Sequence, residues 1–209
     1  MTRLAISVEG QTEEDFAKDL LAAHLQSWGV DVKPILIGRA RGKGQGGGNV
    51  SIGLLAKELQ ALRPNFDAVT SLVDFYGFRG KGAMLPDDLL QAIRESIGRY
   101  DERFVFPYVQ MHEFEGLLFS NVNAFERVFL DPPIADLRSI RSAFDTPEDI
   151  NDSSATAPSK RIKKLIPSYR KRLDGPLLAV EIGLDGIRSQ CPRFDAWLRR
   201  LESLGEPAT

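Results

Sequence analysis

The sequence predicts an α/β protein in which a mostly parallel, four-stranded sheet is flanked by helices and followed by a C-terminal helical extension. Short apolar runs, typical of buried strands, alternate with amphipathic helical patterns up to residue 120. Acidic residues follow the ends of three of these runs, and beyond residue 120 the pattern changes to helices and turns. We therefore expect an α/β core over residues 1–120 and a helical extension over residues 121–209 packed on the same core.

Four apolar runs mark the expected strands: Leu4–Val8, Val32–Ile37, Ala68–Val73 and Phe104–Val109. Between them, apolar residues recur at helical spacing. The first helix begins near Thr12, and Gly29 ends it. The second ends before Pro64, and the third begins near Pro86. In the extension, apolar spacing predicts helices over residues 134–144 and 194–201.

Charge and composition restrict the possible functions. The chain has 209 residues and a net charge of −2, so contact with nucleic acid requires local basic patches, such as residues 38–48 and 159–172. No apolar run reaches the roughly 20 residues that span a bilayer, and the N-terminus enters a strand pattern directly, so we expect a cytoplasmic protein without a membrane segment. The single cysteine, Cys191, is expected to be a small buried thiol.

The acids at the predicted strand ends are the main candidates for chemistry. Glu9 follows the first strand, Asp74 follows the third, and Glu113 and Glu115 follow the fourth. In an open α/β sheet, ligands bind beyond the carboxyl ends of the strands, where several loops converge. Such oxygen ligands suit Mg²⁺, which polarises a phosphoryl group and generates a nucleophilic water. Each acid taken alone is better explained as a loop cap or an arginine partner, but their convergence favours a shared site.

The glycine-rich stretch allows two further interpretations. Residues 42–47 satisfy the dinucleotide pattern G-x-G-x-x-G, and Asp67 lies near the distance expected of a ribose-binding acid. The pattern follows the second strand and not the first, so we do not favour a dinucleotide site. No G-x-x-x-x-G-K-[ST] motif occurs in the chain. We prefer a loop that closes over phosphates with Arg39, Arg41 and Lys43.

Six segments resemble a known family. They are VEGQTEEDF (8–16), LVDFYGF (72–78), MHEFEGLLFS (111–120), TPEDIND (146–152), TAPSKRI (156–162) and IGLDGIRSQCPRFDAWL (182–198). Together they resemble domain-of-unknown-function family 4276 (DUF4276), and the resemblance covers almost the whole chain. That family is similar to the Toprim (Rossmann-like) fold, the module shared by topoisomerases, primases and overcoming-lysogenization-defect nucleases.

The resemblance to Toprim implies roles for the strand-end acids. Glu9 matches the glutamate that serves as general acid or base and contacts metal. Asp74 matches the first acid of the Toprim Asp-x-Asp pair, but the second acid is absent because position 76 is Tyr. This departure leaves Glu113 or Glu115 to complete one Mg²⁺ (or Mn²⁺) site. His112 is expected to act as a general base or to orient a phosphate, unless it is structural.

The basic family segment gives a second set of candidates. The resemblance makes Asn151, Ser159, Lys160 and Arg161 candidate site residues without saying what they bind. Together with Lys163 and Lys164, the basic residues of this segment are expected to neutralise backbone phosphates, and Tyr169 is expected to stack on a base. The alternative is that these charges form only a solvated helix face.

Three hypotheses about function follow. The first is a metal-dependent Toprim-type nuclease acting on DNA or RNA, as a component of bacterial defence or DNA processing. The second is a non-catalytic or conditionally active partner subunit of an ATPase, because Toprim-like defence proteins are commonly paired with one. The third is a small-molecule phosphotransferase that uses the same acids.

Overall fold

The computed structural model describes residues 1–38, 50–151 and 156–205. It divides the chain into two compact units, one formed by Met1–Val109 together with the residues from Arg200 onward, and one formed by Gln110–Arg199. The boundary lies before the predicted position at residue 120 because the 3-10 helix Phe114–Ala124 packs against helices of the second unit. The end of the chain returns to the first unit, where Thr2 Oγ1 donates to the carbonyl of Leu204 at 2.9 Å.

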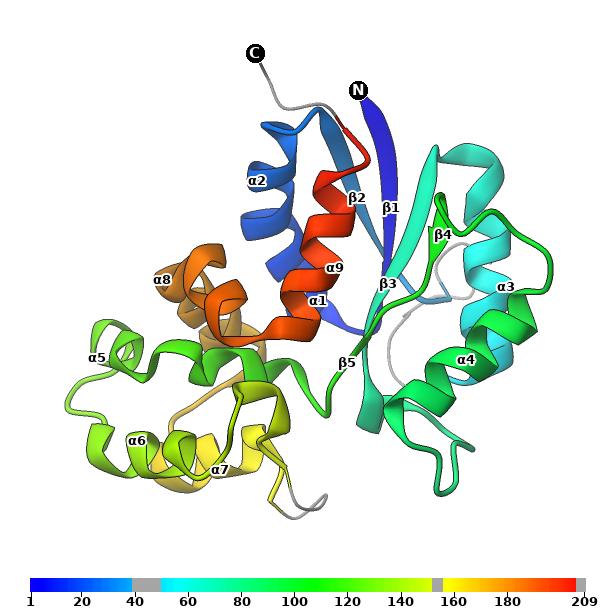
Figure 1. Ribbon diagram of the computed structural model, residues 1–209. Coiled ribbons are helices and arrows are strands. Elements are labelled where there is room, and N and C mark those ends of the chain that lie inside the picture. The colour runs from blue at the N-terminus through cyan, green and yellow to red at the C-terminus, as the bar shows by residue number, and fades with distance from the viewer. Residues whose placement is uncertain (39–49, 152–155, 206–209) are drawn as a thin grey trace. The chain divides into compact units, whose positions relative to one another are not determined.

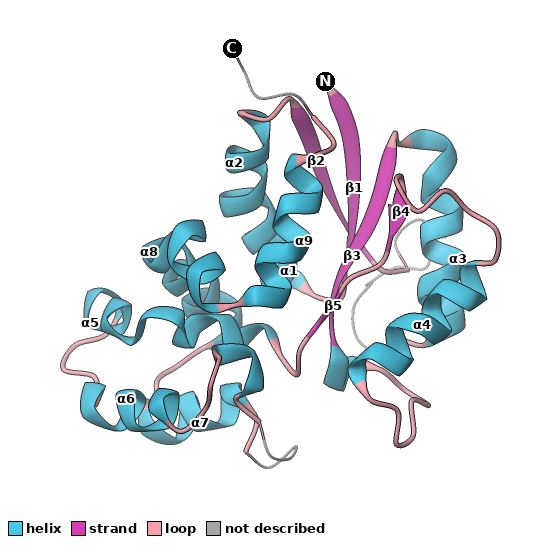
Figure 2. Cartoon of the chain, viewed as in Figure 1, coloured by secondary structure: helices cyan, strands magenta, loops and turns pink. Residues whose placement is uncertain are grey.

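The first unit is built on a parallel sheet with the strand order β2-β1-β3-β4 (Figures 1 and 2). Its strands are β1 (Thr2–Val8), β2 (Val30–Leu36), β3 (Ala68–Asp74) and β4 (Val105–Phe106). β1 pairs in parallel with both β2 and β3, with Val8 opposite Leu36 and Leu72. Every residue of β3 is buried, as expected for an inner parallel strand covered on both faces.

Helices cover both faces of this sheet, on opposite sides of the strands in Figure 1. On one side, α1 (Gln11–Phe16) continues through a π-helical turn (Ala17–Leu21) into α2 (Ala22–Gln26). On the other side lie α3 (Ile52–Leu62) and α4 (Pro86–Ile97). The apolar core under α3 and α4 takes alternate strand residues, including Ala5, Val69 and Val73.

The fourth predicted strand is interrupted. Instead of one strand over Phe104–Val109, the chain forms β4 and a separate short strand, β5 (Val109–Gln110), which also pairs with β3. Pro107 lies between them and has no backbone N–H to donate. Hydroxyl groups of β3 replace ladder bonds here, since Ser71 Oγ donates to the carbonyl of Tyr108 at 2.8 Å and accepts its N–H at 3.0 Å.

The second unit is helical. Its elements after the Phe114–Ala124 helix are α5 (Phe125–Val128), α6 (Ile134–Ser142), a 3-10 turn (Pro147–Asp149), α7 (Pro158–Leu165), α8 (Lys171–Gln190) and α9 (Pro192–Glu202), whose last residues, from Arg200, belong to the first unit. Cys191, between α8 and α9, is a buried thiol, as predicted. Burial raises the pKa of Cys191 to about 12, and Ser120 lies within hydrogen-bonding distance of it, at 3.3 Å.

The predicted fold class is confirmed, since the chain is α/β with a mostly parallel sheet flanked by helices and a C-terminal helical part. In the part of the chain that the structure describes, no helix combines the length and the apolar character needed to cross a membrane.

Candidate functional site

Two of the predicted acids lie at one edge of the sheet in the first unit. Glu9 follows the last residue of β1, and Asp74 is the last residue of β3. These strands are neighbours and run parallel, with Val8 opposite Leu72, so both carboxylates emerge at the carboxyl edge of the sheet. Asp74 is only 7% exposed, and Glu9 is half-buried. The structure thus places the two acids to which the Toprim resemblance gives roles at the ends of neighbouring strands.

The turn after Asp74 fits closely against Glu9. Phe75–Gly77 forms one turn of 3-10 helix. A Cβ atom built on Gly77 would lie 2.6 Å from Cδ of Glu9, and closer still to its carboxylate oxygens. Contacts under 3.0 Å are not tolerated without movement, so only glycine leaves space for the Glu9 carboxylate in this position. Gly77 lies in the segment LVDFYGF (72–78), and nothing in the sequence pattern predicts this role for it.

Tyr76 occupies the position where the resemblance to Toprim implies a second acid. The ammonium group of Lys81 lies 5.6 Å from the centroid of the Tyr76 ring and 5.0 Å from that of Phe75, within the range of cation–π contacts. The segment that follows Asp74 therefore carries a positive charge and two aromatic rings in place of a second carboxylate.

Within residues 1–38, 50–151 and 156–205, no three or more His, Cys, Asp or Glu side chains are grouped so that they could hold a metal ion. Mg²⁺ often binds through only one or two carboxylates and takes its remaining ligands from water and substrate phosphates. The pair Glu9 and Asp74 fits that mode of binding better than a site closed by protein ligands.

His112 and Glu113 belong to the second unit. His112 has a φ of 61°, in the left-handed region that residues other than glycine rarely adopt. Burial lowers the pKa of His112, while the carboxylates of Asp149 and Glu113 oppose this shift. A neutral imidazole at pH 7 follows, as a general base requires. Glu113 Oε2 accepts the backbone N–H of Ser159 at 3.1 Å and so connects two of the family segments.

Glu115 differs from an open metal ligand. It is completely buried, and its Oε1 accepts the Tyr169 hydroxyl at 3.3 Å while its Oε2 lies 3.0 Å from the ammonium of Lys171. Burial raises the pKa of Glu115, and Lys171 opposes the rise. Both oxygens of Glu115 are therefore engaged by protein groups in this conformation.

Tyr169 was expected to stack on a base, and its position contradicts that expectation. It is 3% exposed, and its ring centroid lies 6.4 Å from that of Phe129. Burial and the neighbouring Glu115 raise the pKa of Tyr169 above its usual value. The side chain is a neutral packing residue whose hydroxyl positions Glu115.

The basic candidates lie on or near α7. Lys160, Lys163 and Lys164 are exposed, as phosphate contacts require. Arg161 instead donates from Nε to the carbonyl of Thr156 at 2.6 Å, with its guanidinium 5.4 Å from the centroid of the Phe144 ring. Asn151 and Ser159 are half-buried. Arg39, Arg41 and Lys43 lie outside the described residues.

Comparison with known proteins agrees with the sequence segments. The model of the family described as "Domain of unknown function (DUF4276)" matches residues 8–202. The chain belongs to this family. The solved C-terminal region of the OLD protein from Xanthomonas campestris pv. campestris is similar to the DUF4276 chain, with 17% identity and a TM-score of 0.46 over 98% of this chain and 96% of that chain. The search of curated protein sequences found no match to the DUF4276 chain.

Glu148 connects two further segments of the DUF4276 chain. It is 2% exposed, and its carboxylate accepts the backbone N–H groups of Arg193 at 2.9 Å and of Phe194 at 3.1 Å. These are among the N–H groups at the start of α9 that have no partner within the helix. Burial raises the pKa of Glu148, and the two N–H donors oppose the rise. Glu148 of the TPEDIND segment is thus a cap for α9.

Replacing Glu148 with Ala should lower the free energy of unfolding by about 3 kcal/mol, because two buried N–H groups lose a charged acceptor. Urea unfolding followed by tryptophan fluorescence would measure the change, since Trp197 lies on α9 and is 5% exposed. The control Glu126→Ala removes an exposed carboxylate of the same unit and should have almost no effect. Equal stability of the two variants would exclude the capping role.

Proposed function

We propose that the chain is a divalent-metal-dependent nuclease of the Toprim type, which cleaves phosphodiester bonds of DNA or RNA with Mg²⁺ or Mn²⁺. The observation that carries the proposal is the position of Glu9 and Asp74 at the carboxyl ends of two adjacent parallel strands. Gly77 leaves space there for the Glu9 carboxylate. The resemblance of the surrounding segments to Toprim supports the same assignment.

In this proposal the two acids have different roles. Asp74, buried and fixed at the end of β3, is a metal ligand. Glu9 is less buried; it contacts the metal and transfers the proton, either taking it from the attacking water or giving it to the leaving oxygen. The metal, when bound, polarises the phosphoryl oxygen and lowers the pKa of its water. Tyr76, in place of a second acid, favours one metal ion over two.

Calorimetric titration of Mg²⁺ and Mn²⁺ into the purified protein tests the metal site. We expect saturable binding that Asp74→Ala weakens at least about tenfold, because removal of even an outer-shell partner has an effect of that size. Glu95→Ala, which removes an exposed carboxylate of the same unit, should bind as the wild type does. The variant Glu113→Ala tests separately whether that carboxylate contributes to metal binding. Absence of binding in the wild type would contradict a preformed metal site.

A partner subunit of an ATPase is the second candidate, favoured by the Tyr at position 76, which removes an acid on which Toprim nucleases depend. In this version the activity needs a neighbouring ATPase, in a bacterial cytoplasm and in defence or DNA processing. Co-purification with such an ATPase would support it. Full cleavage activity of the isolated chain would contradict it.

A further inference from the structure

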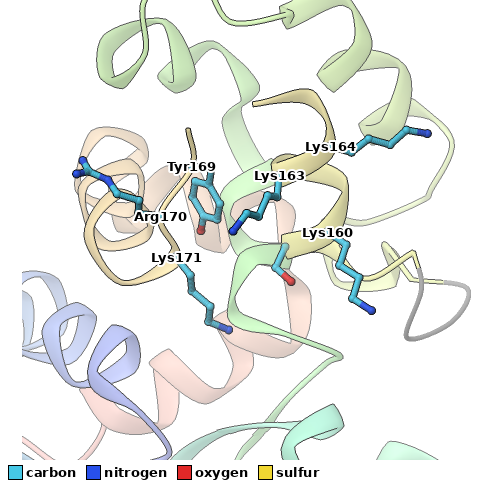
Figure 3. A pocket seen from close by; sticks show the side chains of 7 residues that line it. Lys160, Lys163, Lys164, Tyr169, Arg170 and Lys171 are labelled. Carbon is cyan, nitrogen blue, oxygen red and sulfur yellow. The ribbon is translucent and has the colours of Figure 1, made fainter. Parts of the chain in front are cut away.

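A pocket of about 550 Å³ lies in the second unit, between α7, the turn that follows it and the first residue of α8 (Figure 3). Five of its seven lining residues are cationic, and none is acidic. The lining residues are Ser159, Lys160, Lys163, Lys164, Tyr169, Arg170 and Lys171. A concave site with such walls attracts anions.

Only part of this positive charge is compensated. Arg170 pairs with Asp174 at 3.2 Å, and Lys171 pairs with the buried Glu115 at 3.0 Å. Among the described residues, Lys160, Lys163 and Lys164 form no ion pair. Glu113 is a third carboxylate beside the pocket, since its Oε2 accepts the backbone N–H of the lining residue Ser159 at 3.1 Å. Counted over the described residues, three carboxylates against five cations leave two positive charges, so the pocket has a net attraction for an anion that carries more than one charge.

The ammonium of Lys163 lies toward the Tyr169 hydroxyl. In Figure 3, Lys163 directs its ammonium group toward that hydroxyl, whereas Lys171 points away from it, and so do Arg170 and Lys164. The ammonium of Lys171 is fixed by its ion pair with the buried carboxylate of Glu115, which also accepts the Tyr169 hydroxyl. Holding a charged group in place before the ligand arrives lowers the entropy lost on binding.

We infer that this pocket binds a phosphate monoester, carried either on the end of a nucleic-acid strand or on a free nucleotide. A monoester has a charge between about −1.5 and −2 at pH 7, which suits the net positive charge of this pocket better than a singly charged phosphodiester does. The volume lies within the range of small-ligand pockets, about 300–1,000 Å³, so the group that carries the phosphate has space as well. The inference requires no metal ion and does not depend on the proposed nuclease activity.

Binding of a short single-stranded oligonucleotide with a 5′-phosphate, measured in EDTA by fluorescence anisotropy, tests this inference. It should bind at least about tenfold more tightly than the same oligonucleotide with a 5′-hydroxyl, since each charge-assisted hydrogen bond contributes about 1.5–3 kcal/mol. Competition by a nucleoside 5′-monophosphate distinguishes the sources, because only a site for free nucleotides is blocked by it as effectively as by the strand end.

Matched variants locate the effect. Lys163→Ala should abolish the preference for the phosphorylated strand, while Arg172→Ala, which removes an exposed charge that does not line the pocket, should retain it. Lys171→Ala should also lose the preference, but it removes the cation that pairs with the buried Glu115, so the exposed Lys163 is the decisive variant.

The pH dependence separates a monoester from a diester. The second ionisation of a phosphate monoester has a pKa of about 6, so the preference should decline as the pH falls from 7.5 to 5.5, while the lysines stay charged. Equal binding of the phosphorylated and unphosphorylated strands, or a preference that survives in Lys163→Ala, would overturn the inference.

Discussion

Replacing Gly77 with Ala is expected to lower the rate of phosphodiester cleavage and to weaken Mg²⁺ binding, with a loss of about 100-fold in cleavage. An added Cβ would lie 2.6 Å from Cδ of Glu9, so the Glu9 side chain must move out of its position beside the Phe75–Gly77 turn. A displacement of about 1 Å in a reacting group is sufficient for a loss of this size. Cleavage of a labelled strand and calorimetric Mg²⁺ titration would measure both effects.

The Gly77→Ala variant tests the steric effect of an added Cβ on Glu9, because the backbone at Gly77 is not strained by alanine. Its φ lies outside the left-handed region, so alanine adopts the same conformation. Gly53→Ala is the matched control, since nothing lies within 4 Å of its added Cβ and the residue is on α3, where alanine should stabilise by about 1 kcal/mol. Wild-type Mg²⁺ affinity and cleavage in Gly77→Ala would show that the Glu9 carboxylate has no role.

The α/β core could be predicted because its signals are local. Leu4–Val8 and Ala68–Val73 are continuous apolar runs, which a strand buried on both faces requires. The acids that follow these runs reach the same edge of the sheet for a topological reason, since β1 and β3 are parallel neighbours. The apolar pattern predicted the two strands, and the observed strand order places Glu9 and Asp74 at the ends of neighbours.

Features that depend on contacts between distant residues could not be predicted. The run Phe104–Val109 reads as one strand, but Pro107 divides it and Ser71 supplies the bonds that the backbone then lacks. The contact of Ser71 with Tyr108 is not recognisable from the neighbours of either residue in the sequence.

Helix α8 was not predicted for a local reason. Pro176 and Gly183 lie within it, and both residues usually interrupt helices; Gly183 adopts a φ of 74° there.

For the acids of the second unit, too, the sequence gives the residue type but not the surroundings of the side chain. Glu113 and Glu115 look alike in the sequence, as two carboxylates after a strand. Their environments differ because Tyr169 and Lys171 engage the completely buried Glu115. Glu148 likewise looks in the sequence like any polar residue of a family segment. In the structure its carboxylate accepts two backbone N–H groups at the start of α9. The type of residue gave the chemistry available, and the tertiary contacts determined how it is used.

The substitution Glu9→Gln is expected to reduce cleavage by a factor of about 10²–10⁴, the usual contribution of a general acid or base. Glutamine has almost the same shape as glutamate, so the space beside Gly77 remains filled and the fold is retained. Only the proton-accepting carboxylate is lost. Single-turnover cleavage at saturating Mg²⁺ would measure the loss, with Glu14→Gln as a control, because Glu14 already pairs with Lys18 at 2.7 Å.

Combining Glu9→Gln with Gly77→Ala decides whether the two residues act as one unit. If alanine at position 77 acts by displacing the Glu9 carboxylate, it should cost little further activity once that carboxylate is gone, and the two losses should be far from additive. Additive losses would mean that Gly77 affects cleavage through another group, such as the neighbouring Asp74. Cleavage rates of the four proteins in the cycle thus separate a positioning role of Gly77 toward Glu9 from a general disturbance of the turn.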